Sequence, residues 1–472
     1  MFFTTLAFQL GSQSDDLGYT ISEAINTNRD IINKKFHEQW RHLIYKPLED
    51  CLFNERHVVV IDALDECDSE QDVQELLKVI SQVKDDNGCM LRFFITSRPE
   101  IPVKHGFDRM EYVSFYDYAL HDIDIGVVNQ DIKIYLKSEL KEIDRKYSGA
   151  ERDWPSQNEV DRLAGRAGKL FIYAATASRF IDQGGSSLFE ERLTEILEDD
   201  SDGSEEIDKM YTQVLEHSIP ANFRAKDEKL FFERFQCIIG TIVVLFKPLT
   251  VLALGGLLSG PGHTMSHVTA GVDVIRRMLP PLGSILDISK NNDATIRIFH
   301  LSFRDFLLNK ERCKVRGFGV SEEKTHVYLA DCCLSLMSAI LKKNICDVQE
   351  PGALSSELRP SKVNECLPAQ VQYACQYWVY HIKEGRDIIC DNHQAYSFLV
   401  SHFLHWLEAL SLIGKLSESI GMIDNLLVTV DVSHLVILVR LFTKIISFSL
   451  QQALNYPGFF TMRSVLSSAT AQ

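Results

Sequence analysis

The stretch VVVIDALDEC, from Val58 to Cys67, decides the fold. It begins with a continuous, largely β-branched apolar run, which is typical of a strand buried on both faces of a parallel sheet. Helical spacing of apolar residues between Ser69 and Val83 predicts a crossover helix, and LRFFIT, from Leu91 to Thr96, predicts a second buried strand. We therefore expect one β-α-β unit with parallel strands.

Carboxylates cluster where the first predicted strand ends. Asp62 directly follows the apolar run, and Asp65 and Glu66 come just after it. Ligands of open α/β sheets bind outside the carboxyl ends of the strands. An aspartate at this point can hold the magnesium ion that bridges nucleotide phosphates, and a further acid can orient an attacking water. The alternative is a strand that ends in an acidic turn without chemistry.

The second predicted strand ends in ITSRPE, so Thr96, Ser97 and Arg98 should emerge beside Asp62 on the same edge of the sheet. Polar or cationic groups placed there can sense a terminal phosphate and balance its charge. Taken alone, Arg98 is more often a partner in a surface ion pair. The pairing of the two strand ends is what favours a phosphate site.

Helical periodicity dominates the rest of the chain. Residues 1–56 show helical spacing, and a third strand with its connection is expected between Glu111 and Ile125. Amphipathic helices follow up to about Ser218. Residues 231–310 predict three helices and a short hairpin, which is the pattern of a small winged-helix module, and the remainder reads as helical.

Charge and cysteine usage narrow the possible partners. The formal charge of −16 repels phosphate backbones and anionic lipids, which disfavours nucleic acids and membrane surfaces. The 11 cysteines form no CxxC pair and no small disulfide framework, which favours reduced thiols and a cytoplasmic location.

The apolar stretches Cys237–Phe246 and Leu435–Leu450 are too short or too interrupted by charge to span a bilayer. We expect no transmembrane segment.

Motifs spread over almost the whole chain carry a resemblance to a known family. They are FFTTLAFQL, VVVIDALDEC, FFITSRPE, GKLFIYAATASRFI, FHLSFRDFLL and HWLEALSLIGKLSESI. With them the chain resembles the NACHT class of signal-transducing NTPases with numerous domains (STAND), and most closely its fungal NLR-like, nephrocystin-like branch. The pair DALDE and TSRPE is fairly specific to this class, whereas the aromatic helix motifs are specific mainly in combination.

The resemblance implies ATP or ADP with magnesium as cofactors. By this resemblance Asp62 is the Walker B magnesium ligand, and Asp65 and Glu66 are the additional acids of the class, with catalytic roles. Arg98 is similar to the sensor residue that follows the second strand. His300, in FHLSFRDFL, is similar to the winged-helix histidine that reaches the β-phosphate of bound ADP. A histidine satisfied in a helical core is the alternative for His300.

The pattern of the class is incomplete here. Its members have a G-x-x-x-x-G-K-[ST] loop before the FFTTLAFQL segment, and no such motif occurs in the 472 residues. The loop's backbone N–H groups and lysine hold the phosphates, so most of the binding energy for a triphosphate is lost without it. GRAGK, from Gly165 to Lys169, has neither the spacing nor the following hydroxyl residue. We expect a chain truncated before this Walker A loop, with weak or absent nucleotide binding.

The expected fold class is α/β and then mostly α: an incomplete P-loop NTPase sheet followed by helical, winged-helix and helical domains. The predicted domains are a partial nucleotide-binding domain over residues 1–125, a helical domain over 126–218, a winged-helix domain over 219–325 and a C-terminal helical domain over 326–472. In this class, nucleotide exchange releases the winged helix and permits oligomerisation.

Three functions follow from these observations. The first is an NLR-like signalling or regulatory protein with a degenerate or truncated nucleotide switch and no catalytic activity as given. The second is a nucleotide-independent scaffold that binds full-length relatives, or itself, through its helical domains. The third is a fragment of an active ATP-binding protein whose N-terminal part is missing. All three predict protein partners.

Overall fold

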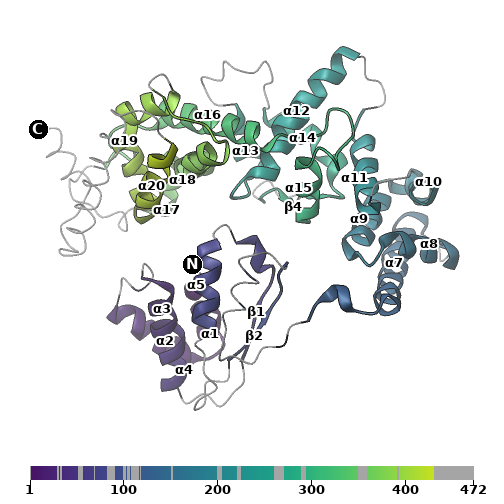
Figure 1. Cartoon of the computed structure of the whole chain (residues 1–472), viewed down its shortest axis with the longest axis horizontal. Helices are drawn as coiled ribbons and strands as arrows, with labels where there is room; N and C mark the ends of the chain where they lie inside the picture. Colours follow the sequence, from purple (N-terminus) through teal and green to yellow (C-terminus); the bar gives the residue numbers. More distant parts are fainter. Residues whose placement is uncertain are drawn as a thin grey trace, which may run out of the picture. The chain divides into compact units, whose positions relative to one another are not determined.

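The protein is described by a computed structural model, in which the chain divides into two compact units, Met1–Asp122 and Ile123–Gln472 (Figure 1). Each unit is considered by itself. The structure describes residues 2–28, 31, 34–51, 57–67, 70–81, 91–98, 103, 107, 116, 118–149, 152–198, 205–220, 225–259, 271–288, 294–348, 359–390 and 393–429.

The first unit contains the expected β-α-β unit. Strands β1 (His57–Ile61) and β2 (Leu91–Ile95) pair in parallel, with His57 opposite Leu91 and Ile61 opposite Ile95. Helix α5 (Glu70–Ile80) lies between them in the chain, so the predicted crossover helix is confirmed. The elements before β1 are α1 (Phe2–Gly11), α2 (Asp15–Thr27), α3 (Phe36–Gln39), the π-helical segment η2 (Trp40–Tyr45) and α4 (Lys46–Asp50).

Only one face of β1 is buried. Val59 and Ile61 lie in the core of the first unit, whereas Val58 and Val60 are 63% and 64% exposed. Successive side chains of a strand point to opposite faces, and the apolar core that includes Trp40 packs against only one of them. The prediction of a strand buried on both faces is therefore wrong.

Most of the predicted third strand, between Glu111 and Ile125, lies outside the described residues. The part that is described forms the short 3-10 helix η4 (Leu120–Asp122) and the start of the next α-helix at Ile125. The described sheet of the first unit consists of β1 and β2.

The described part of the second unit is mostly helical, and its two strands, β3 (Leu286–Asp287) and β4 (Arg297–Ile298), pair antiparallel. The mostly helical character that the sequence predicts is thus confirmed. The winged-helix identity and the domain boundaries stay predictions. The helices are α7 (Ile125–Ser148), α8 (Gln157–Ala167), α9 (Phe171–Asp182), α10 (Gly185–Glu198), α11 (Glu206–His217), α12 (Ala225–Val244), α13 (Val251–Leu258), α14 (Val272–Met278), α15 (Leu301–Leu308), α16 (Glu322–Ile340), α17 (Pro360–Cys366), α18 (Ala369–Glu384), α19 (Gln394–Leu412) and α20 (Ser419–Thr429).

Local sequence signals fix the ends of these helices, and α8 shows how. The Ser156 side chain accepts the Glu159 N–H, while Glu159 accepts the Ser156 N–H at 2.8 Å, which together form a capping box. At the other end Gly168 adopts the left-handed conformation that stops the helix. The backbone N–H groups at the start of α8 and the carbonyl groups at its end, which lack partners within the helix, are thereby partly satisfied.

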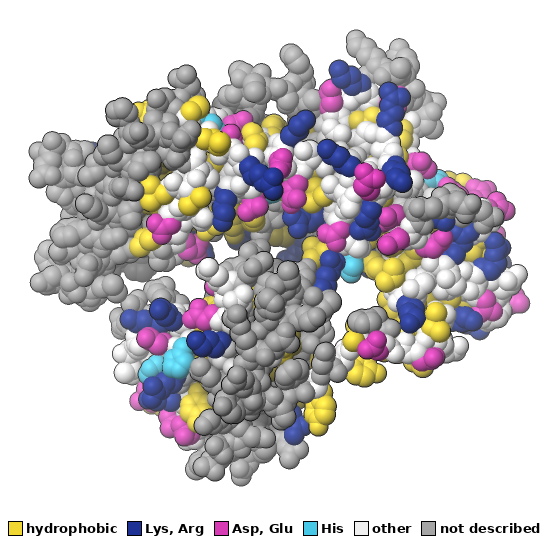
Figure 2. Space-filling view, viewed as in Figure 1, with side chains coloured by type: hydrophobic (Ala, Val, Ile, Leu, Met, Phe, Trp, Pro, Cys, Tyr) yellow, Lys and Arg dark blue, Asp and Glu magenta, His cyan; other side chains and the backbone are white. Residues whose placement is uncertain are grey.

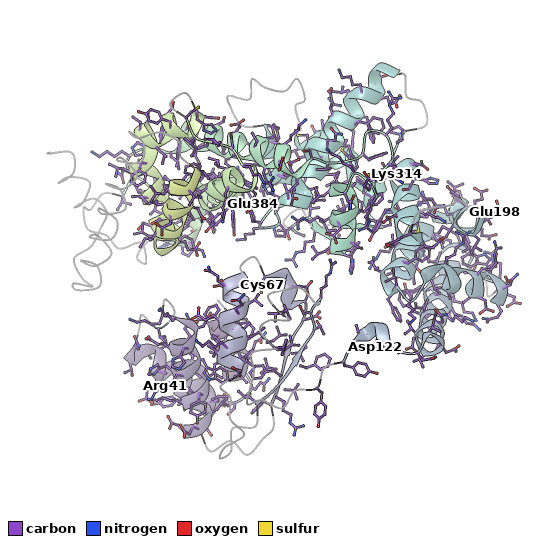
Figure 3. All side chains as sticks on the ribbon, viewed as in Figure 1. Arg41, Cys67, Asp122, Glu198, Lys314 and Glu384 are labelled. Carbon is purple, nitrogen blue, oxygen red and sulfur yellow. The ribbon has the colours of Figure 1, made fainter. Side chains whose placement is uncertain are left out.

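An aromatic core lies between α16, α18 and α19. Trp378 and Trp406 are fully buried with ring centroids 5.5 Å apart, and Trp406 Nε1 donates to the Cys375 carbonyl at 2.8 Å. Side chains fill the spaces between the helices of this unit (Figure 3). On the visible surface, Lys and Arg side chains are interspersed with Asp and Glu (Figure 2). Arg304 and Glu322 form one ion pair of the second unit, at 2.7 Å.

Two further groups of residues pack within the helical core of the second unit. His326, Cys332 and Cys333 are buried on one helix, α16, where burial raises the pKa of both thiols. The YWVYH segment, Tyr377–His381, belongs to α18 and contributes to its packed core. None of the described helices is both long and apolar enough to cross a membrane, and Leu435–Leu450 lies outside the described residues.

Two glycines with positive φ provide a test of this packing. Gly317 has φ +90°, and a Cβ there would lie 2.4 Å from the Phe232 ring, whereas Gly149 has φ +68° and nothing within 4 Å of a built Cβ. Both alanine variants pay about 1 kcal/mol for the backbone conformation. Gly317→Ala should cost about 1–3 kcal/mol more because it also overpacks the core. Urea denaturation followed by circular dichroism checks this; equal losses would contradict the packing described.

Candidate functional site

The carboxyl ends of β1 and β2 meet at one edge of the first unit's sheet. The backbone ladder continues just past the strands, because Thr96 N donates to the Ile61 carbonyl and Leu64 N donates to the Thr96 carbonyl, both at 2.9 Å. Asp62 and Thr96 therefore leave the sheet side by side. The segment after β1 runs through the 3-10 helix η3 (Leu64–Glu66) to Cys67, which is labelled in Figure 3.

The Thr96 hydroxyl joins the two strand ends. Its Oγ1 donates a hydrogen bond to Asp62 Oδ1 and accepts the Ala63 N–H at 2.8 Å. Ala63 has φ 53°, a left-handed conformation that is uncommon for alanine, and the bond to Thr96 helps to hold it. Asp62 is nevertheless exposed, and its carboxylate has a second oxygen beyond the one bound by Thr96.

Asp65 has a different environment. Its Oδ1 accepts the Arg98 N–H at 3.0 Å, and its Oδ2 lies 3.6 Å from Arg98 Nε. The Asp65 side chain is 6% exposed and that of Arg98 37% exposed. One carboxylate thus holds both the main chain and the guanidinium of the residue predicted to sense a phosphate. The catalytic role predicted for Asp65 stays a prediction, and the Glu66 side chain lies outside the described residues.

His300 belongs to the second unit, where it caps the N-terminus of α15. Its Nδ1 accepts the Ser302 N–H at 3.1 Å and lies 2.7 Å from Ser302 Oγ, which is itself 2.7 Å from the Tyr211 hydroxyl. A backbone N–H can only donate, so neutral His300 carries its proton on Nε2. The ring is exposed at a helix start rather than satisfied within a helical core.

Tyr211 and Ser302 are residues that the sequence reasoning missed. The Tyr211 ring packs against Phe303 at 5.2 Å, and its burial raises the pKa of the hydroxyl to about 12. Tyr211 and Ser302 lie 91 residues apart in the chain, and no motif links them. The signal that could have pointed to Ser302 is its place two residues after His300, where a capping side chain finds a backbone N–H.

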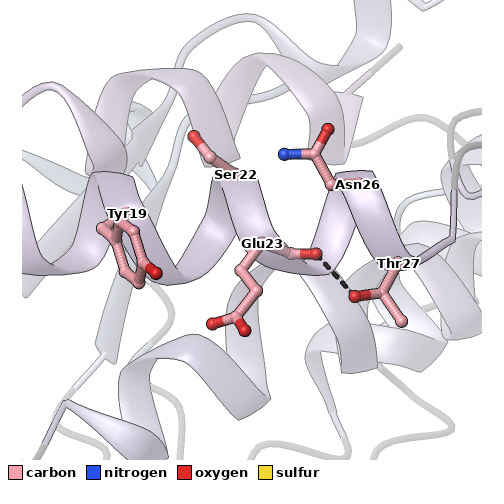
Figure 4. A pocket seen from close by; sticks show the side chains of 5 residues that line it. All are labelled: Tyr19, Ser22, Glu23, Asn26 and Thr27. Atoms are coloured by element: carbon pink, nitrogen blue, oxygen red, sulfur yellow. Dashed lines mark hydrogen bonds between the residues drawn. The ribbon is translucent and has the colours of Figure 1, made fainter.

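A surface hollow elsewhere in the first unit does not belong to this site. It has a volume of about 290 Å³ and lies along α2, and none of the predicted site residues lines it (Figure 4). Within it the Thr27 hydroxyl donates to the Glu23 carbonyl at 2.8 Å, a bond internal to the helix. Its lining residues are Tyr19, Ser22, Glu23, Asn26 and Thr27.

The strand ends fit the magnesium side of a nucleotide site. Magnesium commonly takes one or two carboxylates and completes its shell with waters and phosphate oxygens. Asp62 supplies one exposed carboxylate whose position Thr96 fixes. The described residues contain no group of three or more His, Cys, Asp and Glu that could hold a metal without such a ligand. A phosphate cradle of the GxxxxGK[ST] type is absent from the sequence.

Comparisons with known proteins agree with the motifs. Residues 1–98 match the family model described as Nephrocystin 3, N-terminal, a range that ends at Arg98. The chain is 22% identical over 392 residues to the vegetative incompatibility protein HET-E-1 of Podospora anserina; the match covers 78% of this chain. It spans 26% of the length of that relative. No solved structure matches the chain. The two matches support a relationship to NLR-like, NACHT-related proteins.

The bridge at the strand ends predicts a specific loss of stability. Thr96→Val keeps the side-chain shape but removes the bonds to Asp62 and Ala63, so the first unit should lose about 1–3 kcal/mol. Ser97→Ala is the matched control, because the Ser97 hydroxyl bonds only to the neighbouring Arg98 carbonyl among described residues. Hydrogen exchange of β1 and β2 peptides measures both. Equal protection in the two variants would show that Thr96 does not join the strands.

Proposed function

We propose that this chain is the nucleotide-sensing part of an NLR-like signalling protein, with a switch that binds nucleotide weakly. The observation that carries the proposal is the Thr96 bridge, which holds an exposed Asp62 carboxylate at the edge where parallel sheets bind ligands. The similarity to a vegetative incompatibility protein supports a role in signalling. We expect this chain not to turn nucleotide over.

Each residue of the site has a proposed task. Asp62 would hold magnesium, which when bound neutralises the charge of the terminal phosphates. Arg98 would balance the remaining negative charge, with its main chain and guanidinium held by Asp65. Glu66 would orient water. For His300, at the start of α15 in the second unit, the contact with the β-phosphate that the family resemblance implies stays a prediction.

The affinity of the chain for nucleotide should be low. Without a GxxxxGK[ST] motif in the 472 residues, the backbone cradle and its lysine contribute nothing to binding. The remaining contacts at the strand ends are one carboxylate and one guanidinium, for which a Kd of about 0.1–1 mM is reasonable. Output would pass to protein partners in the cytoplasm, either full-length relatives or further copies of the chain. The described cysteines are all free thiols, which fits that compartment.

A binding titration tests the proposal. Isothermal titration of the purified chain with ADP or ATP in excess magnesium should give a Kd of about 0.1–1 mM. Asp62→Asn should weaken binding at least about tenfold, because removing a charge-assisted contact costs about 1.4 kcal/mol or more. Chelating the magnesium should have the same effect on the native chain.

Asp16→Asn is the control, since it removes the same charge from an exposed position on α2 of the same unit. It should leave the Kd unchanged. A flat titration up to about 1 mM nucleotide, or equal affinity of the Asp62 variant and the native chain, would contradict nucleotide sensing. The nucleotide-independent scaffold would then be the better account.

A further inference from the structure

Two histidines face each other in the core of the second unit. His326 of α16 and His381 of α18 are 2% and 0% exposed, and their Nδ1 atoms lie 2.8 Å apart. The two helices pack side by side (Figure 1). Buried polar groups need hydrogen-bond partners, and charged ones need counter-charges. The protonation state of this pair therefore matters to the contact between α16 and α18.

The contact between the two rings requires one unprotonated Nδ1 atom. Phe246 N donates to the Tyr373 hydroxyl at 3.3 Å, and that hydroxyl lies 2.8 Å from His381 Nε2. The Tyr373 oxygen accepts from Phe246, because a backbone N–H can only donate. The contact between the rings is a hydrogen bond only while one of the two Nδ1 atoms carries a proton and the other does not. If both Nδ1 atoms carried protons, two donors would face each other at 2.8 Å in the core.

No described neighbour supplies a compensating negative charge. Phe246 lies over the pair, with its ring centroid 4.9 Å from that of His381 and 5.7 Å from that of His326. Arg304 of α15 is the charged group that acts on His326; it opposes protonation and is itself paired with Glu322. Burial and this arginine lower the pKa of His326 to about 4, and burial also lowers the pKa of His381.

Two titratable groups on the other packed helices have partners away from the histidine pair. Cys237 of α12 contacts the Tyr328 hydroxyl at 3.5 Å, and Glu408 of α19 accepts the Asn344 and Ile345 N–H groups. Helix α13 has no titratable side chain. Other titratable groups on these elements include Tyr377 and Tyr380 of α18, Lys247 before α13, His402 and His405 of α19 and Asp424 of α20.

We propose that the His326–His381 pair is an acid-sensitive latch, which opens the contact of α16 with α18 and releases the Phe246 segment when the pH falls below about 6. Phe246 lies between α12 and α13, so opening would loosen the connection of those helices to α18. This device is independent of nucleotide binding at the strand ends. It would couple cytoplasmic acidification to the state of the C-terminal helices.

Proton linkage determines how the stability of the closed form changes with pH. An exposed histidine has a pKa of about 6.5, so each histidine of the opened form takes up a proton that the closed form excludes. The closed form is therefore fully favoured above pH 6.5, and its advantage declines as the pH falls toward the lowered pKa. With two histidines the opening constant should rise by about 10- to 100-fold per pH unit between pH 6 and 5.

Hydrogen exchange of the full chain between pH 7.5 and 5, corrected for intrinsic rates, measures this opening. Peptides from α16 and α18 should lose protection steeply, whereas peptides from α7, α8 and α9, which contain no histidine, should not. This comparison within the native chain needs no variant. Parallel loss of protection in both groups of helices would overturn the proposal.

Variants then assign the effect to the pair. Replacing both residues, His326→Gln with His381→Gln, retains hydrogen-bonding groups but removes the titration, so the pH dependence of α16 and α18 should disappear. His217→Gln is the matched control, because His217 is a partly exposed histidine of α11 bound to Glu195 at 2.7 Å. It should leave the steep dependence intact. A double variant that keeps the native slope would refute the latch.

Discussion

The Thr96 hydroxyl lies between the Asp62 carboxylate and the Ala63 amide, and the candidate site depends on these two hydrogen bonds. Parallel strands bring their carboxyl ends to one edge, but the side chains beyond the last ladder bond are not fixed by the sheet itself. Here one hydroxyl performs that task for both strands. It holds Ala63 in a left-handed conformation and leaves Asp62 exposed to solvent at the edge. A carboxylate fixed before its ligand arrives loses less conformational entropy on binding.

The carboxylates after β1 have different environments, and this difference suggests a division of roles. Asp62 is exposed, whereas Asp65 is nearly buried and holds Arg98 through both its main chain and its guanidinium. The exposed Asp62 is suited to binding a ligand, and the nearly buried Asp65 is suited to positioning Arg98. In the other unit, His300 is oriented in a comparable way by the start of α15 and by Ser302, which contacts Tyr211. In both places short-range geometry sets the direction in which a functional group can act.

Local patterns predicted the β-α-β unit and the meeting of Asp62 with Thr96, because strand periodicity and parallel pairing suffice for both. They did not predict that Val58 and Val60 are exposed, since a run of β-branched residues looks the same whether one or both faces are covered. The Thr96 bridge requires the left-handed Ala63, which no propensity favours. The links of Tyr211 to Ser302 and of His326 to His381 join residues 91 and 55 positions apart, so only the fold brings them together.

If the Thr96 bridge organises the site, its energy should appear as coupling between Asp62 and Thr96. A double-mutant cycle with Asp62→Ala, Thr96→Val and their combination measures this coupling from the free energy of opening of β1 and β2. We predict a coupling of about 1 kcal/mol, since the bond is charge-assisted but its carboxylate is exposed. Additive effects within about 0.3 kcal/mol would contradict the account, because the two side chains would then act independently.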